Sequence, residues 1–266
     1  MTNKQAYVFC TDALGKSDGT FLFQALTGIS VTDVLTHPDA EVGQDLRSAV
    51  ERAKNGEPVQ YIAGITEFMS LPFHVTPAVL IPRQDTETLV EFLLSKVPMG
   101  AEGLDLCTGS GCIAVALAHY LKADMTALDI SDAALEIARK NAEKNHVEIR
   151  FVQGDAKRFS NLKDLDFIVS NPPYIESAVV DNLEKKVKDF EPRLALDGGE
   201  NGLDFYGAIA ENSRKMLKDG GVLAVEIGFN QGKAVESIFK DVFGNAKVLS
   251  DLCGNDRVVY AIKENV

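Results

Sequence analysis

From about residue 85 onward, short apolar runs alternate with longer stretches in which apolar residues recur on one helical face. The short runs predict strands and the longer stretches predict helices. Short strands separated by helices indicate a parallel sheet covered by helices on both faces. The last two predicted strands have no helix between them, so we expect a hairpin there and one antiparallel strand at the end of the sheet. Strands are expected over residues 103–106, 125–129, 148–153, 165–170, 221–227, 247–249 and 257–263, and helices over 87–96, 113–121, 132–144 (capped by Asp132), 205–217 and 231–242.

Residues 1 to about 72 lack strand alternation and are predicted to be helical. One helix leads into Gly28 as its C-cap, a short helix is capped by Ser30 or Thr32, and a third runs from Asp39 to Lys54. Composition alone favours a small bundle that only packs on the main domain over a module that recruits substrate.

A β-hairpin is predicted over residues 68–82, where apolar residues alternate with turn residues in two runs, 71–75 and 79–82. The sequence therefore predicts three units. These are a helical bundle over residues 1–66, a hairpin linker over 67–84 and an α/β domain over 85–266.

The chain has 266 residues, a formal net charge of −12 and a pI near 4.8. Nucleic-acid affinity usually rests on clustered Lys and Arg, so this balance argues against a broad phosphate-binding surface. The four cysteines show no CxxC pair and no ligand spacing with histidine, so neither a zinc site nor a disulfide framework is expected. There is no signal-like segment and no apolar run long enough to span a bilayer, so we expect a cytoplasmic protein without a membrane partner.

The stretch Asn171-Pro172-Pro173-Tyr174 directly follows a predicted strand, at the sheet edge where open α/β folds bind ligands. Two consecutive prolines remove two N–H donors and fix two φ angles. What remains is a stiff turn with bare carbonyl oxygens, an Asn amide and an aromatic ring. This set suits the binding of a flat, conjugated NH2 group.

Such an NH2 group is a poor nucleophile because its lone pair is delocalised. The Asn171 side-chain oxygen can accept one of its hydrogens and the Pro172 carbonyl the other, while Tyr174 stacks on the plane. The lone pair would then point at a methyl donor, so catalysis would rest on alignment rather than on a strong base. Adenine and a glutamine amide both carry such a group, and the turn does not distinguish them.

A loop with two glycines, Cys107-Thr108-Gly109-Ser110-Gly111, joins the first strand of the α/β domain to its helix. It lacks the full G-x-G-x-x-G pattern and the lysine of a P-loop. Asp105 lies beneath this loop, and Asp129 and Asp155 follow the next two strands, where a carboxylate can bind ribose hydroxyls. Carboxylates repel a pyrophosphate and favour a cation, so we expect S-adenosylmethionine. The alternative is that Asp129 and Asp155 only cap the helices that follow them.

With these motifs in place, the chain resembles the HemK/PrmC family, the peptide chain release factor N5-glutamine methyltransferases, over nearly its whole length. The turn at 171–174 is shared with adenine and guanine methyltransferases, whereas residues 80–87 and the helical N-terminus are more specific to this family. Besides the turn, the matching segments are 56–64 (GEPVQYIAG), 80–87 (LIPRQDTE), 104–111 (LDLCTGSG), 191–196 (EPRLAL), 202–206 (GLDFY), 226–228 (EIG) and 256–259 (DRVV).

The resemblance implies a Rossmann-like, seven-stranded class I methyltransferase domain behind a helical bundle that recognises the substrate. It implies methyl transfer from S-adenosylmethionine to the glutamine of a Gly-Gly-Gln motif in class-1 release factors, with S-adenosylhomocysteine as product. The enzyme would be a monomer that does not bind nucleic acid directly. Residues 175–190 would form a mobile flap over the glutamine channel.

The resemblance also implies residue roles by matched position. Asn171, Pro172 and Tyr174 would be catalytic, and Pro173 would help them to bind the substrate glutamine. Arg83 and Glu87 would shape the mouth of the site. The residues expected to contact the cofactor are Cys107, Thr108, Gly109, Ser110, Gly111, Asp129, Ile130, Asp155, Ala156 and Asn171.

Two positions depart from the family pattern. Cys107 stands where the family has Gly, so its Cβ would crowd the cofactor or require a negative φ. Gln84 replaces a Pro and would loosen that turn.

Two rival functions follow from other interpretations of the site. A nucleic-acid amine methyltransferase acting on adenine N6 or guanine N2 would need a basic groove or a base-recognition domain, and a cofactor-binding regulator would not need Asn171 and Tyr174.

Overall fold

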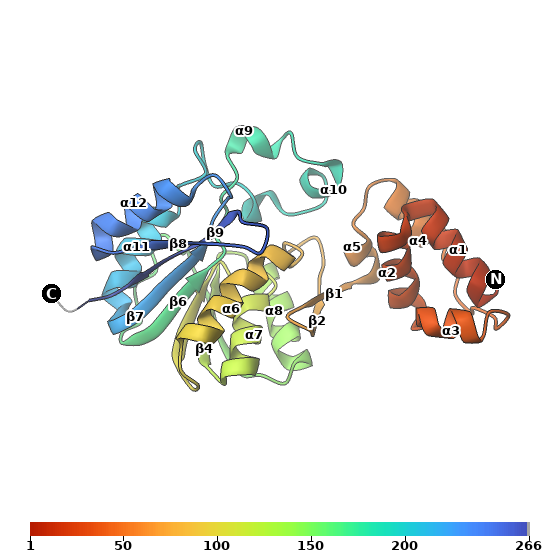
Figure 1. Ribbon diagram of the computed structural model, residues 1–266, viewed down its shortest axis with the longest axis horizontal. Helices are drawn as coiled ribbons and strands as arrows, with labels where there is room; N and C mark the ends of the chain where they lie inside the picture. Colours follow the sequence, from red (N-terminus) through yellow and green to blue (C-terminus); the bar gives the residue numbers. More distant parts are fainter. Residues whose placement is uncertain (265–266) are drawn as a thin grey trace.

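The computed structural model describes residues 1–264 as two bodies joined by a narrow connection (Figure 1). One body is a bundle of helices and the other is an α/β domain. The last two residues of the predicted α/β domain, 265–266, lie outside the described residues. The domain limits at 66/67 and 84/85 stay predictions.

The helical bundle packs five short helices around a small apolar core that includes Ala6, Leu22, Phe23 and Val50. Its second helix ends at Gly28, which takes the left-handed conformation expected of a C-cap. The Ser30 hydroxyl accepts a hydrogen bond from the Asp33 N–H and caps the third helix. The five helices are α1 (Asn3–Leu14), α2 (Lys16–Thr27), α3 (Val31–Thr36), α4 (Arg47–Lys54) and α5 (Val59–Ala63).

The helix predicted from Asp39 is wrong over its first half, since α4 begins only at Arg47. The segment before α4 is instead hydrogen-bonded to the N-terminal residues. The Val42 N–H donates to the Met1 carbonyl at 2.9 Å, and the Asn3 N–H donates to the Ala40 carbonyl at 2.8 Å. These long-range bonds satisfy backbone groups that a helix would otherwise have paired.

The linker hairpin is shorter and earlier in the chain than predicted. Its strands, β1 (Ile65–Phe68) and β2 (Leu71–His74), pair antiparallel around Met69 and Ser70, which both have positive φ. This two-residue turn has the twist that hairpins prefer, although it lacks the usual glycine or asparagine. The strand predicted over 79–82 is absent: Val79 and Ile81 pack against α8 (Asp132–Lys144), and the Tyr61 hydroxyl donates to the Val79 carbonyl at 2.6 Å.

The seven-stranded sheet expected for the α/β domain is confirmed, in the order β5-β4-β3-β6-β7-β9-β8. All neighbours are parallel except β9, which runs antiparallel to both β7 and β8. The antiparallel strand is therefore next to the edge rather than at the end, because β8 pairs outside it. The strands are β3 (Glu102–Leu106), β4 (Asp124–Asp129), β5 (Ile149–Gln153), β6 (Leu165–Ser170), β7 (Leu217–Glu226), β8 (Lys247–Ser250) and β9 (Asp256–Ile262).

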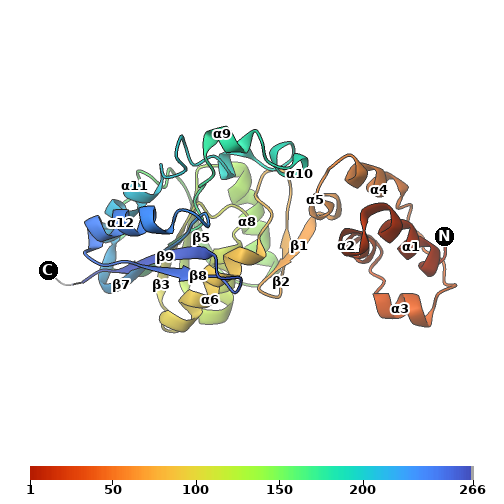
Figure 2. The same cartoon turned by 45° about the horizontal axis from the view of Figure 1, so that its top comes forward.

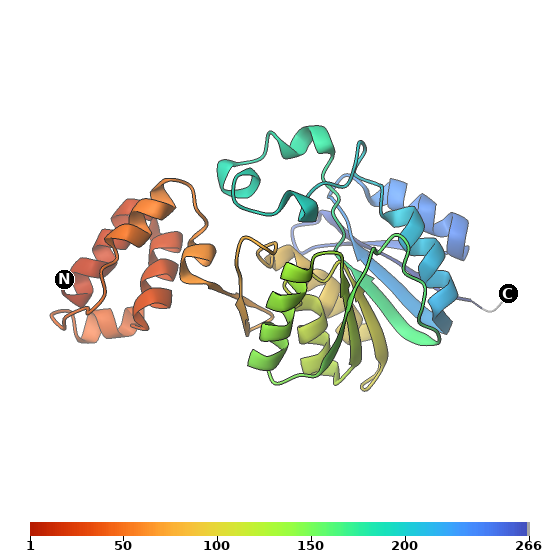
Figure 3. The ribbon, with the colours of Figure 1, turned by 180° about the vertical axis from the view of Figure 1, so that it is seen from behind.

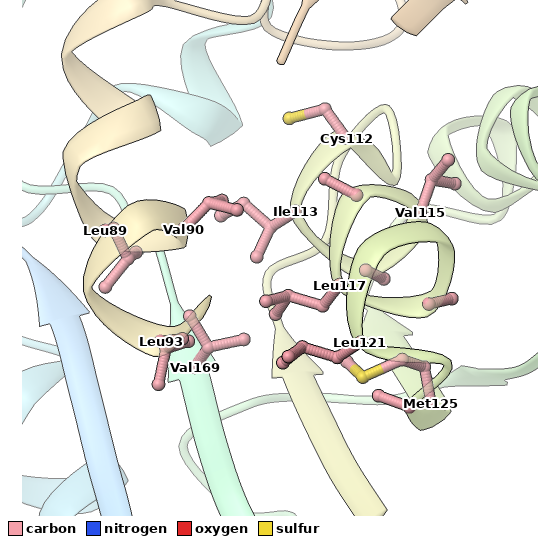
Figure 4. Close-up of a cluster of buried hydrophobic side chains, with 14 of the residues drawn as sticks. Leu89, Val90, Leu93, Cys112, Ile113, Val115, Leu117, Leu121, Met125 and Val169 are labelled. Atoms are coloured by element: carbon pink, nitrogen blue, oxygen red, sulfur yellow. The ribbon is translucent and has the colours of Figure 1, made fainter. Parts of the chain in front are cut away.

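Helices cover both faces of this sheet (Figure 3). One face carries α6 (Glu87–Lys96), α7 (Cys112–Leu121) and α8, and the other carries α11 (Tyr206–Met216) and α12 (Gly232–Phe243). Helix α7 is apolar nearly all round because the sheet and two helices enclose it. In Figure 4 its Ile113 faces Val90 of α6, with Val169 of β6 beneath them.

Helix α8 fastens the hairpin to the α/β domain. Ser131, rather than the predicted Asp132, is its N-cap. The buried Asn141 side chain accepts from the His74 N–H at 2.6 Å and donates to the carbonyls of His74 and Ser110 at 3.0 and 2.8 Å. One side chain thus ties β2 to the glycine loop after β3. This places the hairpin beside the edge of the sheet where the candidate site lies.

Candidate active site

The loops that follow β3, β4, β5 and β6 surround a cavity of about 240 Å³ at the carboxyl edge of the sheet. This is where parallel sheets place ligand sites. The linker loop and the chain after residue 190 close its sides. The lining residues are Ala78, Val79, Leu80, Pro82, Arg83, Thr86, Cys107, Thr108, Gly109, Ser110, Cys112, Ile113, Leu128, Asp129, Ile130, Ser131, Ala134, Gly154, Asp155, Ala156, Lys157, Asn171, Pro173, Pro192, Leu194, Ala195 and Phe205.

The glycine loop is held by the end of the neighbouring strand. The Asp129 carboxylate accepts from the Gly109 N–H at 2.8 Å and from the Ser131 N–H at 2.9 Å. Gly111 has a φ of +79° and is the N-cap of α7, and a Cβ there would lie 3.0 Å from the Ala138 Cβ. Only glycine meets both conditions easily. Asp129 therefore does more than cap a helix, because α8 is capped by Ser131.

Asp105 is fully buried beneath this loop and accepts a 2.6 Å hydrogen bond from the Thr108 hydroxyl through Oδ2. Its Oδ1 atom has no hydrogen-bond partner within residues 1–264. Burial raises the pKa of this carboxyl to about 7, against the lowering effect of the Thr108 bond. Burial likewise raises the pKa of Asp129, and the backbone donors around it act in the opposite direction.

Cys107 has a φ of +60°, in the left-handed region. The expectation that this residue requires a negative φ is therefore wrong. The turn is imposed by its neighbours: the Thr108 N–H donates to the Leu128 carbonyl at 3.0 Å and Gly109 is held by Asp129. Burial raises the pKa of the Cys107 thiol, which keeps it protonated. A non-glycine residue in this conformation carries local strain.

The predicted substrate turn lies at the end of β6, beside the glycine loop. Asn171 and Pro173 line the cavity. The Asn171 amide donates to the Thr86 hydroxyl at 3.2 Å. The Tyr174 hydroxyl points away from the cavity and donates to the Glu226 carboxylate at 3.1 Å.

The chain after residue 196 clamps this turn from outside. The Gln231 side chain donates to the Tyr174 carbonyl at 2.9 Å. A Cβ at Gly198 would lie 2.7 Å from the Pro173 carbonyl oxygen, and one at Gly202 would lie 2.3 Å from the Tyr174 carbonyl oxygen. Both glycines are therefore required by close backbone approach.

Most of the predicted cofactor and substrate residues meet in the one cavity. Cys107, Thr108, Gly109, Ser110, Asp129, Ile130, Asp155, Ala156, Asn171, Pro173 and Arg83 all line it. Four of the predicted residues do not: Gly111, Pro172, Tyr174 and Glu87. Glu87 accepts from the Met69 N–H at 2.7 Å and lines a separate acidic hollow beside the hairpin turn.

Arg83 joins the linker to the far side of the cavity. Its guanidinium pairs with the buried Glu191 carboxylate at 2.5 Å. Glu191 directly follows the predicted flap, residues 175–190, which holds α9 (Ser177–Val180) and α10 (Lys185–Lys188). Both short helices lie on one side of the α/β domain, with α10 toward the bundle (Figure 2), and the chain that follows them lines the cavity with Pro192 and Leu194. The Lys185 stem packs on Gly56 of the bundle, where a Cβ would lie 3.3 Å from the lysine Cδ.

The cavity suits a ligand with an adenosine part, a positive charge and no phosphate. Its acidic residues include Asp129 and Asp155, and Asp105 lies directly beneath. Of the two basic residues that line it, Arg83 is paired with Glu191 and Lys157 lies over the Phe205 ring at 4.9 Å. The half-exposed Ile130 side chain offers an apolar wall for a flat ring. The donor set therefore fits the cationic cofactor that the sequence predicts.

Thr86 and Glu226 also belong to the site, although the sequence predicted no role for either. Both are almost fully buried: Thr86 lines the cavity and contacts Asn171, and Glu226 contacts Tyr174. In the sequence, the one feature that could have indicated these two residues is their position inside two of the matching segments, 80–87 and 226–228.

Within residues 1–264, no group of three or more His, Cys, Asp or Glu is arranged to hold a metal ion, and no helix is long and apolar enough to cross a membrane.

Solved structures share this fold at low sequence identity. A methyltransferase from Pyrococcus furiosus aligns with a TM-score of 0.59 and 18% identity, over 81% of this chain and 98% of that chain. The T. thermophilus 16S rRNA N2 methyltransferase RsmC, solved with AdoMet and guanosine, aligns with a TM-score of 0.56 and 19% identity, over 75% of this chain and 50% of that chain. The fold is that of a class I methyltransferase, as predicted.

Sequence comparison identifies the family within the class I methyltransferases to which the chain belongs. The methyltransferase small domain family matches residues 83–198, and the PrmC N-terminal domain family matches residues 12–64. The release factor glutamine methyltransferase of Moorella thermoacetica is 46% identical over 81% of this chain and 78% of that protein. Its counterpart in Caulobacter vibrioides is 37% identical over 92% of this chain and 89% of that protein. The chain belongs to the release factor glutamine methyltransferase family.

Proposed function

We propose that this protein transfers the methyl group of S-adenosylmethionine to the side-chain nitrogen, N5, of the glutamine in the Gly-Gly-Gln motif of class-1 peptide chain release factors. The observation that carries this proposal is that Asn171 lines the same cavity as the glycine loop and Asp129. A substrate amide and the cofactor would meet there. Membership of the release factor glutamine methyltransferase family supports this substrate.

The residues of this chain bind and orient the two reactants. Asp129 would accept the ribose hydroxyls, Asp155 and Ala156 would flank the adenine, and the glycine loop would face the methionine part. When bound, S-adenosylmethionine supplies a sulfonium-linked methyl group. The acidic lining favours this cation.

The Asn171 oxygen and the Pro172 carbonyl would each accept one hydrogen of the glutamine NH2 group. The lone pair of the nitrogen is then directed at the methyl carbon. The nitrogen–carbon bond would form as the carbon–sulfur bond breaks, S-adenosylhomocysteine would leave, and the nitrogen would release one proton to water. That proton becomes acidic only as the methyl group arrives, so no strong base is needed. The turn contributes alignment and electrostatics, which together lower the barrier.

The partner of the enzyme and its location follow from the proposed substrate. The protein substrate is a translation factor, so the enzyme would work in the cytoplasm. The net charge of −12 gives no support to direct nucleic-acid binding. We treat the enzyme as a monomer, in which the helical bundle recognises the release factor.

A methyl-transfer assay tests the proposal. Purified protein with methyl-labelled S-adenosylmethionine should label a class-1 release factor and leave its Gln→Ala variant at the Gly-Gly-Gln motif unlabelled. DNA and RNA should take up no label. Equal labelling of the variant would disprove the residue assignment, and labelling of nucleic acid alone would establish the rival amine methyltransferase.

A further inference from the structure

The Gln231 side chain joins three separate segments of the chain next to the substrate turn. Gln231 directly precedes α12, is 8% exposed and does not line the cavity. Its Nε2 atom donates to the Tyr174 carbonyl at 2.9 Å and to the Gly202 carbonyl at 3.2 Å. Its Oε1 atom accepts from the Gly228 N–H at 2.9 Å. One carboxamide therefore connects the turn after β6, the chain before α11 and the loop after β7.

The orientation of this carboxamide is determined by its backbone partners. A backbone N–H can only donate, and a carbonyl oxygen can only accept. The Gln231 oxygen must therefore face the Gly228 N–H, and its NH2 group must face the two carbonyls. The Tyr206 hydroxyl, which donates to the Glu226 carbonyl at 3.1 Å, also lies 3.4 Å from the same oxygen. A flipped amide would place donor against donor and acceptor against acceptor.

The backbone of the substrate turn has little freedom of its own. Pro172 and Pro173 have fixed φ angles. A residue that precedes a proline is restricted to extended ψ angles, which applies to Asn171 and to Pro172. The rotations that remain are the ψ angle of Pro173 and the two backbone angles of Tyr174. These rotations set how the turn is oriented relative to the chain that follows it.

The peptide group between Tyr174 and Ile175 limits these last rotations, because it is held at both ends. Gln231 donates to its carbonyl oxygen, and its N–H donates to the Leu196 carbonyl at 2.9 Å. The carbonyl oxygen is also confined sterically, since a Cβ at Gly202 would lie only 2.3 Å from it. The hydrogen bond from Gln231 thus completes the fixation of the turn.

We propose that Gln231 is a positioning residue for methyl transfer: by holding the Tyr174 carbonyl, it fixes how Asn171 and Pro172 face the substrate amide. This inference rests on the proposed function. Within residues 1–264, no backbone N–H donates to the Pro172 carbonyl, so this oxygen keeps its capacity to accept from the substrate. A turn released from Gln231 would carry the same groups with variable alignment. Misplacement of reacting groups by about 1 Å can cost about 100-fold in rate.

Two substitutions at Gln231 test the inference in the full-length enzyme with a class-1 release factor as substrate. Gln231→Met keeps the approximate size of the side chain and removes its hydrogen bonds. Gln231→Glu keeps an acceptor for the Gly228 N–H, but its ionised second oxygen would face the carbonyls of Tyr174 and Gly202. At pH 8.5 both variants should lower kcat by about tenfold or more. The ratio kcat/KM should fall by the same factor, because the lost alignment is needed in the transition state.

The pH dependence of Gln231→Glu distinguishes positioning from general damage. A protonated carboxyl group can donate to the Tyr174 carbonyl again, whereas an ionised one cannot. Burial and the two facing carbonyl oxygens would raise the pKa of the introduced acid. Its kcat, divided by that of the wild type at the same pH, should therefore increase by about threefold or more from pH 8.5 to pH 6. For Gln231→Met the same ratio should stay constant.

The ratio to the wild type removes the effect of the titratable groups around this position. They are Tyr174, Tyr206, Glu226 and Asp256. Burial raises the pKa of both tyrosines, so neither ionises between pH 6 and pH 8.5. The two acids are present in the wild type as well, so their titration affects both enzymes.

Asn245→Asp is the matched control. The Asn245 side chain also accepts from a backbone N–H and donates to a backbone carbonyl, both of Ile262, at 3.0 and 2.9 Å. Ile262 pairs with Val222, at the end of β7 opposite to the substrate turn. The same change from amide to carboxyl should leave kcat unchanged there. Binding of S-adenosylmethionine should change by less than about threefold in all three variants, since none alters a residue that lines the cavity.

The possible outcomes are distinguishable. If the wild type labels the release factor and Gln231→Met keeps its kcat, the positioning role is wrong and the proposed function stands. A kcat ratio for Gln231→Glu that does not increase at low pH also contradicts positioning through the Tyr174 carbonyl. If Gln231→Met does not fold, the pH dependence of Gln231→Glu decides. If the wild type labels no release factor, both the proposed function and the inference are overturned.

Discussion

The Asp129 carboxylate accepts a 2.8 Å hydrogen bond from the Gly109 N–H, and this bond joins the ends of β4 and β3 where the cavity opens. The same carboxylate also accepts from the Ser131 N–H. Both oxygens are thus oriented by backbone donors and keep further acceptor capacity. A ligand with two adjacent hydroxyls can use that capacity.

Asp129→Asn should weaken binding of S-adenosylmethionine by about 10- to 100-fold. The substitution replaces one acceptor by a donor, and a hydrogen bond to a charged group is worth about 1.5–3 kcal/mol. Titration calorimetry of the purified protein measures the change. Asp132→Asn, three residues later on an exposed side chain, is the matched control and should bind like the wild type. Equal affinities for Asp129→Asn and the control would exclude Asp129 from the cofactor site.

Asn171→Ala should reduce kcat by about 100-fold or more while the affinity for S-adenosylmethionine changes little, because under the proposed function the lost contact would align the substrate in the transition state. Single-turnover methylation of a release factor and cofactor titration give the two numbers. Asn161→Ala, at an exposed position in the loop that leads into β6, is the control. A parallel loss of cofactor affinity in Asn171→Ala would contradict the substrate role.

Asn141→Ala should lower the free energy of unfolding by about 3 kcal/mol, since three buried hydrogen bonds are lost at about 1 kcal/mol each. Two of their partners belong to β2 and one to the glycine loop. Urea denaturation followed by circular dichroism measures the loss. Asn212→Ala, which removes a single surface bond to the Lys157 carbonyl, should cost far less. Equal losses in the two variants would show that Asn141 does not fasten the hairpin.

The stability of the wild type should decrease as the pH rises from about 4 to about 7 through the two buried acids, Asp105 and Glu226. Burial raises both pKa values to about 7, from 3.8 and 4.5. Between the unfolded and folded pKa values the folded state binds more protons, so the free energy of unfolding falls as protons leave.

The variant Asp105→Asn isolates one of these contributions, because its amide cannot ionise. Relative to the wild type it should gain stability between about pH 5 and about pH 8, by on the order of 1.4 kcal/mol for each unit of pKa shift. Urea midpoints at the two pH values provide the comparison. A difference between variant and wild type that does not depend on pH would show that the pKa of Asp105 is not raised in the folded protein.

Cys107→Val should destabilise the fold by about 2 kcal/mol or more, because a β-branched residue fits poorly at a φ of +60°. Cys107→Gly should stay within about 1 kcal/mol of the wild type, since relief of strain offsets the greater freedom of the unfolded chain. In thermal unfolding, the Tm of Cys107→Gly should be close to that of the wild type, and the Tm of Cys107→Val should be lower. A valine variant as stable as the wild type would mean that the loop relaxes to a negative φ.

Local pattern was sufficient for much of the α/β domain. The predicted helix over 87–96 and the strand over 165–170 have the observed bounds. The length and the apolar pattern of each segment are typical of one kind of element, a helix for the first and a buried strand for the second. The turn at 171–174 and the glycine loop at 107–111 could be placed at the carboxyl edge because each directly follows a predicted strand.

Local pattern failed where distant contacts decided the backbone. Asp39 is a good helix cap in isolation, but the chain that follows it is bonded to Met1 and Asn3. The run at 79–82 is apolar and resembles a buried strand, but it is held by Tyr61 and α8 and forms no strand. The positive φ of Cys107 also follows from bonds to its neighbours, since nothing in cysteine itself favours it.

The sequence by itself determined the class of fold, the edge of the sheet that carries the site, and the family. It did so because strand periodicity and loop chemistry are local properties. Tertiary structure alone decided which atoms meet behind the site. Thr86 is separated from Asn171 by 85 positions, and no short-range pattern encodes the hydrogen bond between them. Burial away from water raises the pKa of Glu226, and burial exists only once the chain has folded.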